Sequence, residues 1–201
     1  MSTVGWSLWT DGMLDCLSII ERYYTPGKDD YRVLVSHSRQ VANLAVALSQ
    51  RLIDSGVPID IEFVEEAAML HDIGICRTDD PGIHCHGSEP YILHGILGRE
   101  MLDGLGLFRH GRVCERHTGT GLTAAEIIAE GLPIDPPRDL LPETLEEKVI
   151  CYADKFFSKS RPDEGAKSIE RARMSLAKFG GDTLARFDEM RTLFGDPSEQ
   201  E

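Results

Sequence analysis

The sequence predicts an all-α protein, because apolar residues recur at helical spacing along most of the chain and no stretch alternates as a half-buried strand does. The chain has 201 residues, of which 41% are hydrophobic. This size supports one sizeable core and is short for two. We therefore expect a single helical domain over residues 1–201.

Three helices are expected in the first part of the chain. Apolar residues fall on one face over residues 13–24 and again over residues 34–52, and turn-forming residues follow each stretch. A third helix should begin after Asp60, a good N-cap, and Gly74 is placed to end it.

Shorter helices and loops are expected after the third helix. Proline, glycine and other turn formers predict loops at residues 76–90 and 131–144. Thr123 and Glu126 have the spacing of a capping box, which opens a short helix. Residues 195–201 are expected to form a frayed tail. The other helices are expected at residues 91–102, 111–117, 145–157, 162–178 and 183–194.

Composition excludes several kinds of partner. The 21 basic and 34 acidic residues give a net charge of −13, which would repel a long nucleic acid. A small phosphorylated substrate stays compatible with this charge, because a metal ion and local cations can reverse its sign inside a cleft. No apolar run approaches the length of a membrane span, no signal peptide is evident, and the five cysteines include no CxxC pair. These features predict a cytoplasmic protein without membrane partners, and they leave a homodimer open.

The first chemical signal is the run Leu70-His71-Asp72-Ile73-Gly74. It places an imidazole and a carboxylate at the end of an otherwise apolar helix. Burying both groups there without partners would be costly, so they require ligands or hydrogen bonds. On its own, the pair also fits a simple cap at a helix end.

Four further residues favour a metal site over a cap. His37 and Asp154 both have apolar neighbours at helical spacing, so their side chains are predicted to point inward. Together with the His-Asp pair they suggest a shared divalent cation. His94 and His117 add two more imidazoles at inward positions. Six candidate ligands exceed the needs of one catalytic ion, which must keep positions open for water and substrate, so two ions fit better.

The order and context of these residues resemble the HD superfamily of metal-dependent phosphohydrolases, in particular its small single-domain HDIG type. The resemblance covers about residues 31–160. It implies an HD-domain helical bundle with a metal site in its core, on which the N-terminal and C-terminal helices pack. It also implies two divalent ions, drawn from Fe, Mn, Mg, Co, Ni or Zn, with Asp72 as the bridge. The matching pattern consists of His37, the run His71-Asp72-Ile73-Gly74, His94 in His-Gly-x-x-Gly, His117 in Glu-Arg-His-Thr-Gly, and Asp154 in Tyr-Ala-Asp-Lys.

The resemblance further implies hydrolysis of a small phosphate ester, taken to be a nucleotide, by a hydroxide that bridges the metals. Catalysis is assigned first to Asp72 at the bridge. Many HDIG enzymes carry a basic residue shortly after the glycine, where Ile75 and Cys76 stand here. Lys155 and Arg116, each beside a predicted ligand, are therefore the expected stabilisers of the anionic transition state. Both also fit ordinary charges on a solvated helix face.

Several alternatives stay open at this point. The same ligands would suit an HD-type di-iron oxygenase, whereas a non-catalytic nucleotide-binding protein would require an incomplete set. His84 and His86, in the 76–90 loop, fit either the rim of the pocket or plain surface. The basic run 109–116 fits either attraction of an anionic substrate or compensation of an acidic surface. Residues 118–142 fit either a wall of the pocket or a connector packed elsewhere.

Overall fold

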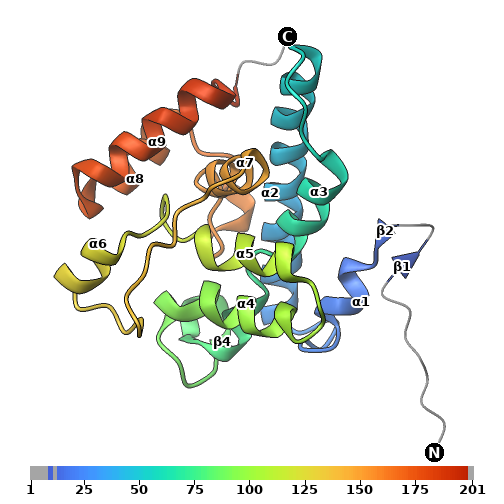
Figure 1. Ribbon diagram of the computed structural model, residues 1–201. Helices are drawn as coiled ribbons and strands as arrows, with labels where there is room; N and C mark the ends of the chain where they lie inside the picture. The colour runs from blue at the N-terminus through green and yellow to red at the C-terminus, as the bar shows by residue number, and fades with distance from the viewer. Residues whose placement is uncertain (1–8, 11–12, 199–201) are drawn as a thin grey trace, which may run out of the picture.

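Helix α2, Asp29–Asp54, is the longest element, and it packs along both α3, Ile61–Leu70, and α7, Leu145–Asp154 (Figure 1). The computed structural model describes residues 9–10 and 13–198. The remaining helical segments of that part are α1 (Cys16–Ile20), η1 (Ile73–Arg77), η2 (Pro81–Ile83), η3 (Tyr91–Leu93), α4 (His94–Asp103), α5 (Phe108–Arg116), α6 (Ala124–Ala129), η4 (Pro162–Glu164), α8 (Ile169–Leu176), η5 (Ala177–Phe179) and α9 (Gly181–Phe194).

The predicted all-α class is confirmed. In the described chain, strands are confined to two-residue segments that pair as two antiparallel hairpins. One hairpin joins β1 (Trp9–Thr10) to β2 (Met13–Leu14), and the other joins β3 (Asp79–Asp80) to β4 (Cys85–His86) inside the predicted 76–90 loop. Across the same residues, no helix is both long and apolar enough to cross a bilayer.

Two hydrophobic clusters divide the core. The first lies between α2, α3, α7, α8 and α9, and it contains Tyr152, Phe156 and Phe187, which are fully buried. The second lies between α1, the start of α2, η1, α4 and α5, with Leu34 and Leu102 among its buried residues. The C-terminal helices therefore share an apolar cluster with α2, α3 and α7.

The first helix is shorter than predicted. Instead of a helix over residues 13–24, the structure has the strand β2 and then α1 from Cys16 to Ile20. The reason is Asp15, whose carboxylate accepts hydrogen bonds from the backbone N–H of Ser18 at 3.0 Å and from its hydroxyl at 2.6 Å. Such a cap fixes the start of a helix at the following residue.

The predicted helix over residues 162–178 is also interrupted. Its first part forms only η4, and Gly165 then takes a left-handed conformation with φ of +66°. Helix α8 begins at Ile169, because the Ser168 side chain accepts a hydrogen bond from the backbone N–H of Arg171. A glycine in this region of φ ends one helical segment before the next cap can start another.

The first residues of the predicted frayed tail, directly after α9, make hydrogen bonds to two helices. The Tyr152 hydroxyl donates to the carbonyl oxygen of Gly195 at 2.8 Å, and Arg51 donates to that of Asp196 at 3.3 Å. These bonds tie the end of α9 to α7 and to α2. Residues 199–201 of the predicted tail lie outside the described residues.

The segment 118–142 has a small apolar cluster of its own. The predicted capping box at the start of α6 is present. Ile127, Ile134 and Leu140 are buried together, and Leu93, which precedes His94, packs against them. The proline-rich return is thus folded onto α6 and lies beside the helix that carries His94. Its role as a wall of the pocket stays a prediction.

The predicted single domain can be tested at Phe187. We expect Phe187→Ala to lower the free energy of unfolding by about 3–5 kcal/mol, because a fully buried phenyl ring leaves a cavity in the core shared with α7. Urea denaturation followed by circular dichroism would measure it. The control is Phe179→Ala, whose side chain is 50% exposed and should cost far less. Two separate unfolding transitions in the unmutated protein would contradict a single domain.

Candidate metal centre

Six buried side chains converge between the helices in two groups that share Asp72. One group is His37, His71, Asp72 and Asp154, and the other is Asp72, His94 and His117. In each group the nitrogen and oxygen atoms that could bind a metal ion lie within 4.8 Å of one another. All six are residues predicted as ligands from the sequence, and the structure brings every one of them together.

The candidate ligands reach this point mostly from helix ends. His71 and His117 directly follow α3 and α5, Asp154 is the last residue of α7, and His94 is the first of α4. His37 alone stands inside a helix, on the buried face of α2. At a helix end the chain can turn its side chain into the space between several helices. Separate helices thus meet at one small volume.

The carboxylate of Asp72 faces both groups. Its Oδ2 lies 3.2 Å from His37 Nε2 and 3.1 Å from His71 Nε2. Its Oδ1 lies 3.2 Å from His117 Nε2 and 3.5 Å from His94 Nε2. Asp72 therefore turns one oxygen toward each group.

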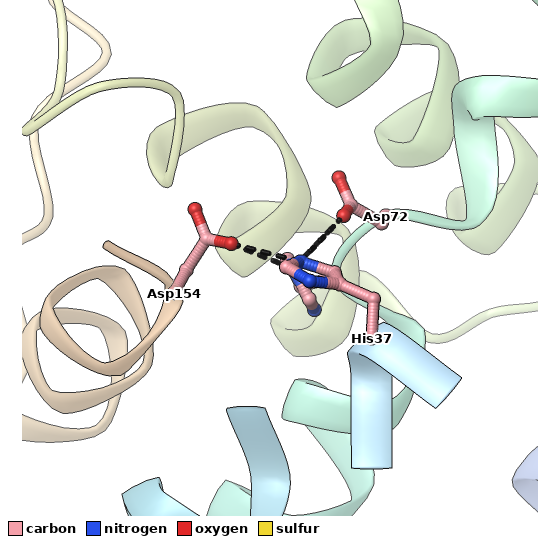
Figure 2. A group of neighbouring side chains, drawn as sticks. His37, Asp72 and Asp154 are labelled. Carbon is pink, nitrogen blue, oxygen red and sulfur yellow. Dashed lines mark hydrogen bonds and ion pairs between the residues drawn. The ribbon is translucent and has the colours of Figure 1, made fainter. Parts of the chain in front are cut away.

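The second carboxylate, Asp154, belongs to one group only. Its Oδ1 lies 2.9 Å from His37 Nε2 and 3.6 Å from His71 Nε2. Figure 2 shows the His37 ring between Asp154 and Asp72. Asp154 is also the most exposed of the six, at 8%, so the centre is closest to solvent on its side.

Backbone carbonyls fix the tautomers of three imidazoles. In each, Nδ1 lies 2.7 Å from the carbonyl oxygen three residues earlier, to which its N–H donates. In the neutral rings of His94 and His117 the Nε2 atom is then left with a free lone pair, which is the form that binds metal. Burial lowers the pKa of His71, but the charge of Asp72 raises it to about 9, so this ring must lose its Nε2 proton to bind a metal ion. The three pairs of imidazole and carbonyl are His71 with Ala68, His94 with Tyr91, and His117 with Cys114.

In this tautomer, two imidazole nitrogens face each other in a contact that a bound cation would stabilise. His94 Nε2 and His117 Nε2 lie 3.0 Å apart, and the two lone pairs face each other. In addition, His71 Nε2 and both oxygens of Asp72 are fully buried, and their contacts in the described chain are ion pairs within the cluster and with Lys159. A divalent ion with nitrogen and oxygen ligands fits this donor set.

Burial and neighbouring charges shift the pKa values of His94 and Asp72 in the directions that favour metal binding. Burial and the nearby His117 lower the pKa of His94 to about 3, so its imidazole is neutral at neutral pH. Burial alone would raise the pKa of Asp72, but the charges of His71 and Lys159 hold it well below its ordinary value. Asp72 is therefore an anion, and the neutral imidazole of His94 beside it is free to bind metal.

Glycines allow the segments that carry the ligands to touch. A Cβ atom on Gly74 would lie 2.2 Å from the carbonyl oxygen of His94 and 2.4 Å from the nitrogen of Gly98. A Cβ on Gly95 would lie 2.4 Å from the carbonyl oxygen of Cys114. The glycines of the two motifs thus set the spacing between η1, α4 and α5. The prediction that Gly74 ends the third helix is wrong, because α3 stops at Leu70 and Gly74 lies inside η1.

The two predicted basic residues differ in their surroundings. Lys155 Nζ lies 2.7 Å from Asp154 Oδ2 and donates to the carbonyl oxygen of His117 at 3.1 Å. It therefore touches one candidate ligand and the backbone of another. Arg116 instead points into an acidic cluster, with Nη1 2.8 Å from Glu143 Oε2 and 3.2 Å from Glu147 Oε2. This pairing favours a structural role for Arg116.

The sequence interpretation missed one basic residue at the centre. Lys159 Nζ lies 2.7 Å from Asp72 Oδ2, and its side chain is only 13% exposed. Lys159 follows the end of α7 in a turn, so helical spacing gave no sign of its direction. Its distance of five residues from Asp154 was the available signal.

The other charged candidates lie outside both ligand groups. His84 and His86 line a pocket of about 520 Å³ with Cys76 and the start of α2, and none of the six candidate ligands lines it. The arginines of the basic run 109–116 are paired with acidic residues. Arg109 pairs with Asp60, and Arg112 with Glu143 and Glu147. These pairs fit compensation of an acidic surface.

Comparison with known proteins agrees with this centre. The HD domain family matches residues 34–158. An uncharacterized protein of Methanocaldococcus jannaschii is 36% identical over 72% of this chain and 78% of its own length. A tRNA (cytidine(56)-2'-O)-methyltransferase of Thermoplasma volcanium is 28% identical over 92% of this chain. A deoxyguanosinetriphosphate triphosphohydrolase-like protein of Geobacter metallireducens is 26% identical over 70% of it. No solved structure matches.

An all-helical bundle with buried imidazole and carboxylate groups defines the class of the protein as a metal-binding helical domain. The match over residues 34–158 covers well over half of the chain, and the chain belongs to the HD domain family. HD domains bind divalent metals, and membership supports a metal-dependent hydrolase in general. The chain spans 48% of the length of the Thermoplasma methyltransferase and 38% of the length of the Geobacter protein.

The shared position of Asp72 gives a direct test. We expect Asp72→Ala to remove all bound metal, because each ligand group loses its carboxylate bridge. Mass spectrometry of the metal content of the purified protein would measure it. The control is Asp188→Ala, which removes an exposed carboxylate paired with Arg173 on the surface. Metal content equal to that of the unmutated protein in Asp72→Ala would refute the bridge.

The glycine contact of α4 gives a second test. We expect Gly95→Ala to leave one equivalent of metal instead of two, because the new methyl group separates α4 from α5 and so parts His94 from His117. Metal titration by calorimetry would count the sites. Gly104→Ala is the matched control, since a Cβ there meets no atom closer than 3.5 Å. Two unaltered sites in Gly95→Ala would show that the backbone contact does not set the spacing.

Proposed function

We propose that this protein is a phosphohydrolase that holds two divalent cations and hydrolyses a small phosphate ester such as a nucleotide. The observation that carries the proposal is the position of Asp72, which turns one carboxylate oxygen to each of two ligand groups. His37, His71 and Asp154 would complete one metal site. His94 and His117 would complete the other, which leaves open positions for water and substrate.

The residues of the centre have separable tasks in this proposal. Bound divalent ions acidify a coordinated water molecule and polarise a phosphoryl oxygen. The carbonyls behind His71, His94 and His117 hold their rings in the metal-binding tautomer. Lys155, bonded to Asp154 and to the backbone of His117, holds those two ligands in place. The burial of the whole group keeps bulk water away from the reacting atoms.

The relatives support a nucleotide more than a transfer RNA. The Geobacter relative carries a name that refers to a nucleoside triphosphate. The Thermoplasma relative is more than twice the length of the matched part, so the activity in its name need not belong to that part. A net charge of −13 also opposes binding of a long phosphate backbone. A small phosphate ester is the better fit.

The proposal is tested by metal content and activity together. We expect two equivalents of metal in protein purified without added metal, and phosphate release from at least one member of a panel of phosphomonoesters, dinucleoside polyphosphates and cyclic dinucleotides. Chelation should abolish the release and added divalent metal should restore it. Two equivalents of iron with oxygen uptake and no phosphate release would instead establish the di-iron oxygenase. Methyl transfer to tRNA would point to the activity named for the Thermoplasma relative.

One variant separates the two metal sites. We expect His117→Ala to keep one equivalent of metal and its fold while losing most activity, since the group around His37 stays complete. Metal analysis and phosphate release are measured on the same sample. His86→Ala is the control, because it removes an exposed imidazole that belongs to neither group. Full activity in His117→Ala would exclude that imidazole from the centre.

A further inference from the structure

The two residues that follow the run His71-Asp72-Ile73-Gly74 carry no charge. Ile75 is fully buried, and Cys76 follows it. The next residue, Arg77, pairs with Glu100 at 2.9 Å, and both side chains are largely exposed. Arg116 is held between Glu143 and other acidic groups. A phosphate at the centre must therefore find its cation elsewhere.

Lys159, one residue beyond the end of the family match, supplies a cation at the centre. Its ammonium touches the bridging carboxylate, with Nζ 2.7 Å from Asp72 Oδ2. It also lies 5.9 Å from the centre of the Tyr91 ring, which stacks on the His94 ring at 4.6 Å. The ammonium thus contacts the carboxylate that both ligand groups share, beside the ring of Tyr91. Its side chain keeps 13% of its surface open to solvent.

The ammonium of Lys159 is not fully engaged by Asp72. Asp72 is its ion-pair partner, and an ammonium has three N–H donors. Lys155 is more fully engaged, since it contacts both Asp154 and the backbone of His117. Lys159 therefore has donors to offer to a phosphate oxygen.

The turn that presents Lys159 is tied to the helices of the centre. Gln40, on α2 one turn after His37, donates from Nε2 to the carbonyl oxygen of Pro162 at 3.0 Å. The backbone N–H of Lys167 donates to the carbonyl oxygen of Phe156 at 2.8 Å. These bonds hold the chain on both sides of Lys159. The position of the ammonium is therefore fixed by hydrogen bonds to the helical core.

We propose that Lys159 is the phosphate-binding residue of this centre. The inference rests on the proposed function, because it names the group that binds the substrate of that reaction. Divalent ions at the centre would share the negative charge of Asp72 and weaken its hold on the ammonium. The N–H groups of Lys159 would then turn to an oxygen of the phosphate. A charge-assisted hydrogen bond of this kind is strong and short.

The test measures phosphate binding and metal binding separately. Inorganic phosphate is titrated calorimetrically into the full-length protein loaded with Mn²⁺. We expect Lys159→Met to weaken phosphate binding roughly 10- to 100-fold, the range for one hydrogen bond between charged groups. Affinity for Mn²⁺ should stay equal or rise, because a competing cation has left Asp72. Lys159→Gln, which keeps N–H donors without the charge, should behave in the same way.

The control and the contrary results are distinct. Lys178→Met removes one positive charge from an exposed side chain on η5 and should leave phosphate binding unchanged. Unchanged phosphate affinity in both Lys159 variants, or none in the unmutated protein, would overturn the inference. Loss of Mn²⁺ binding in both variants would also overturn it, by making Lys159 a structural partner of Asp72. If Lys159-dependent phosphate binding occurs and no ester is hydrolysed, the proposed function fails and this inference stands.

Discussion

The buried carboxylate of Asp72 is the charge on which the rest of the structure depends. A fully buried anion without partners is among the most costly features a protein core can contain. Here α2, α3, α4, α5 and the chain after α7 each bring a nitrogen atom to within 3.5 Å of it. The convergence of the helices is thus linked to the neutralisation of one charge. Because folding already brings these ligands together, a cation that binds at the centre would also stabilise the folded protein.

The close approach of η1, α4 and α5 is what makes the second ligand group possible. Side chains at Gly74 or Gly95 would collide with backbone atoms that no rotamer change can move. The backbones can therefore approach until His94 and His117 face each other at 3.0 Å. A glycine in a helix costs roughly 0.5–1 kcal/mol relative to alanine. At Gly74 and Gly95 this loss of stability accompanies the close contact that brings His94 and His117 together.

The features that could be predicted from the sequence are those that depend on helical periodicity. His37 and Asp154 were found because inward positions on amphipathic helices can be counted, and the all-α class followed from the same pattern. The position of Lys159 at the centre was not predicted, because Lys159 lies in a turn, where helical periodicity does not give the direction of a side chain. The direction of Arg116 depends on Glu143 and Glu147, which are distant in sequence. Gly74 was predicted to end a helix, because glycine is common at helix ends. In the structure the glycine is required for a close contact with α4, and the sequence alone does not distinguish these two reasons.

The charges outside the centre explain how a strongly acidic protein can still select an anion. Arg77, Arg109 and Arg112 each pair with an acidic side chain, so little positive potential extends from them. Lys155 and Lys159 instead face the two carboxylates of the centre. Cations bound there would outweigh those carboxylates and leave a positive charge confined to a small volume. A long polyanion would meet the surrounding negative surface, whereas a single phosphate group can fit within the positive region.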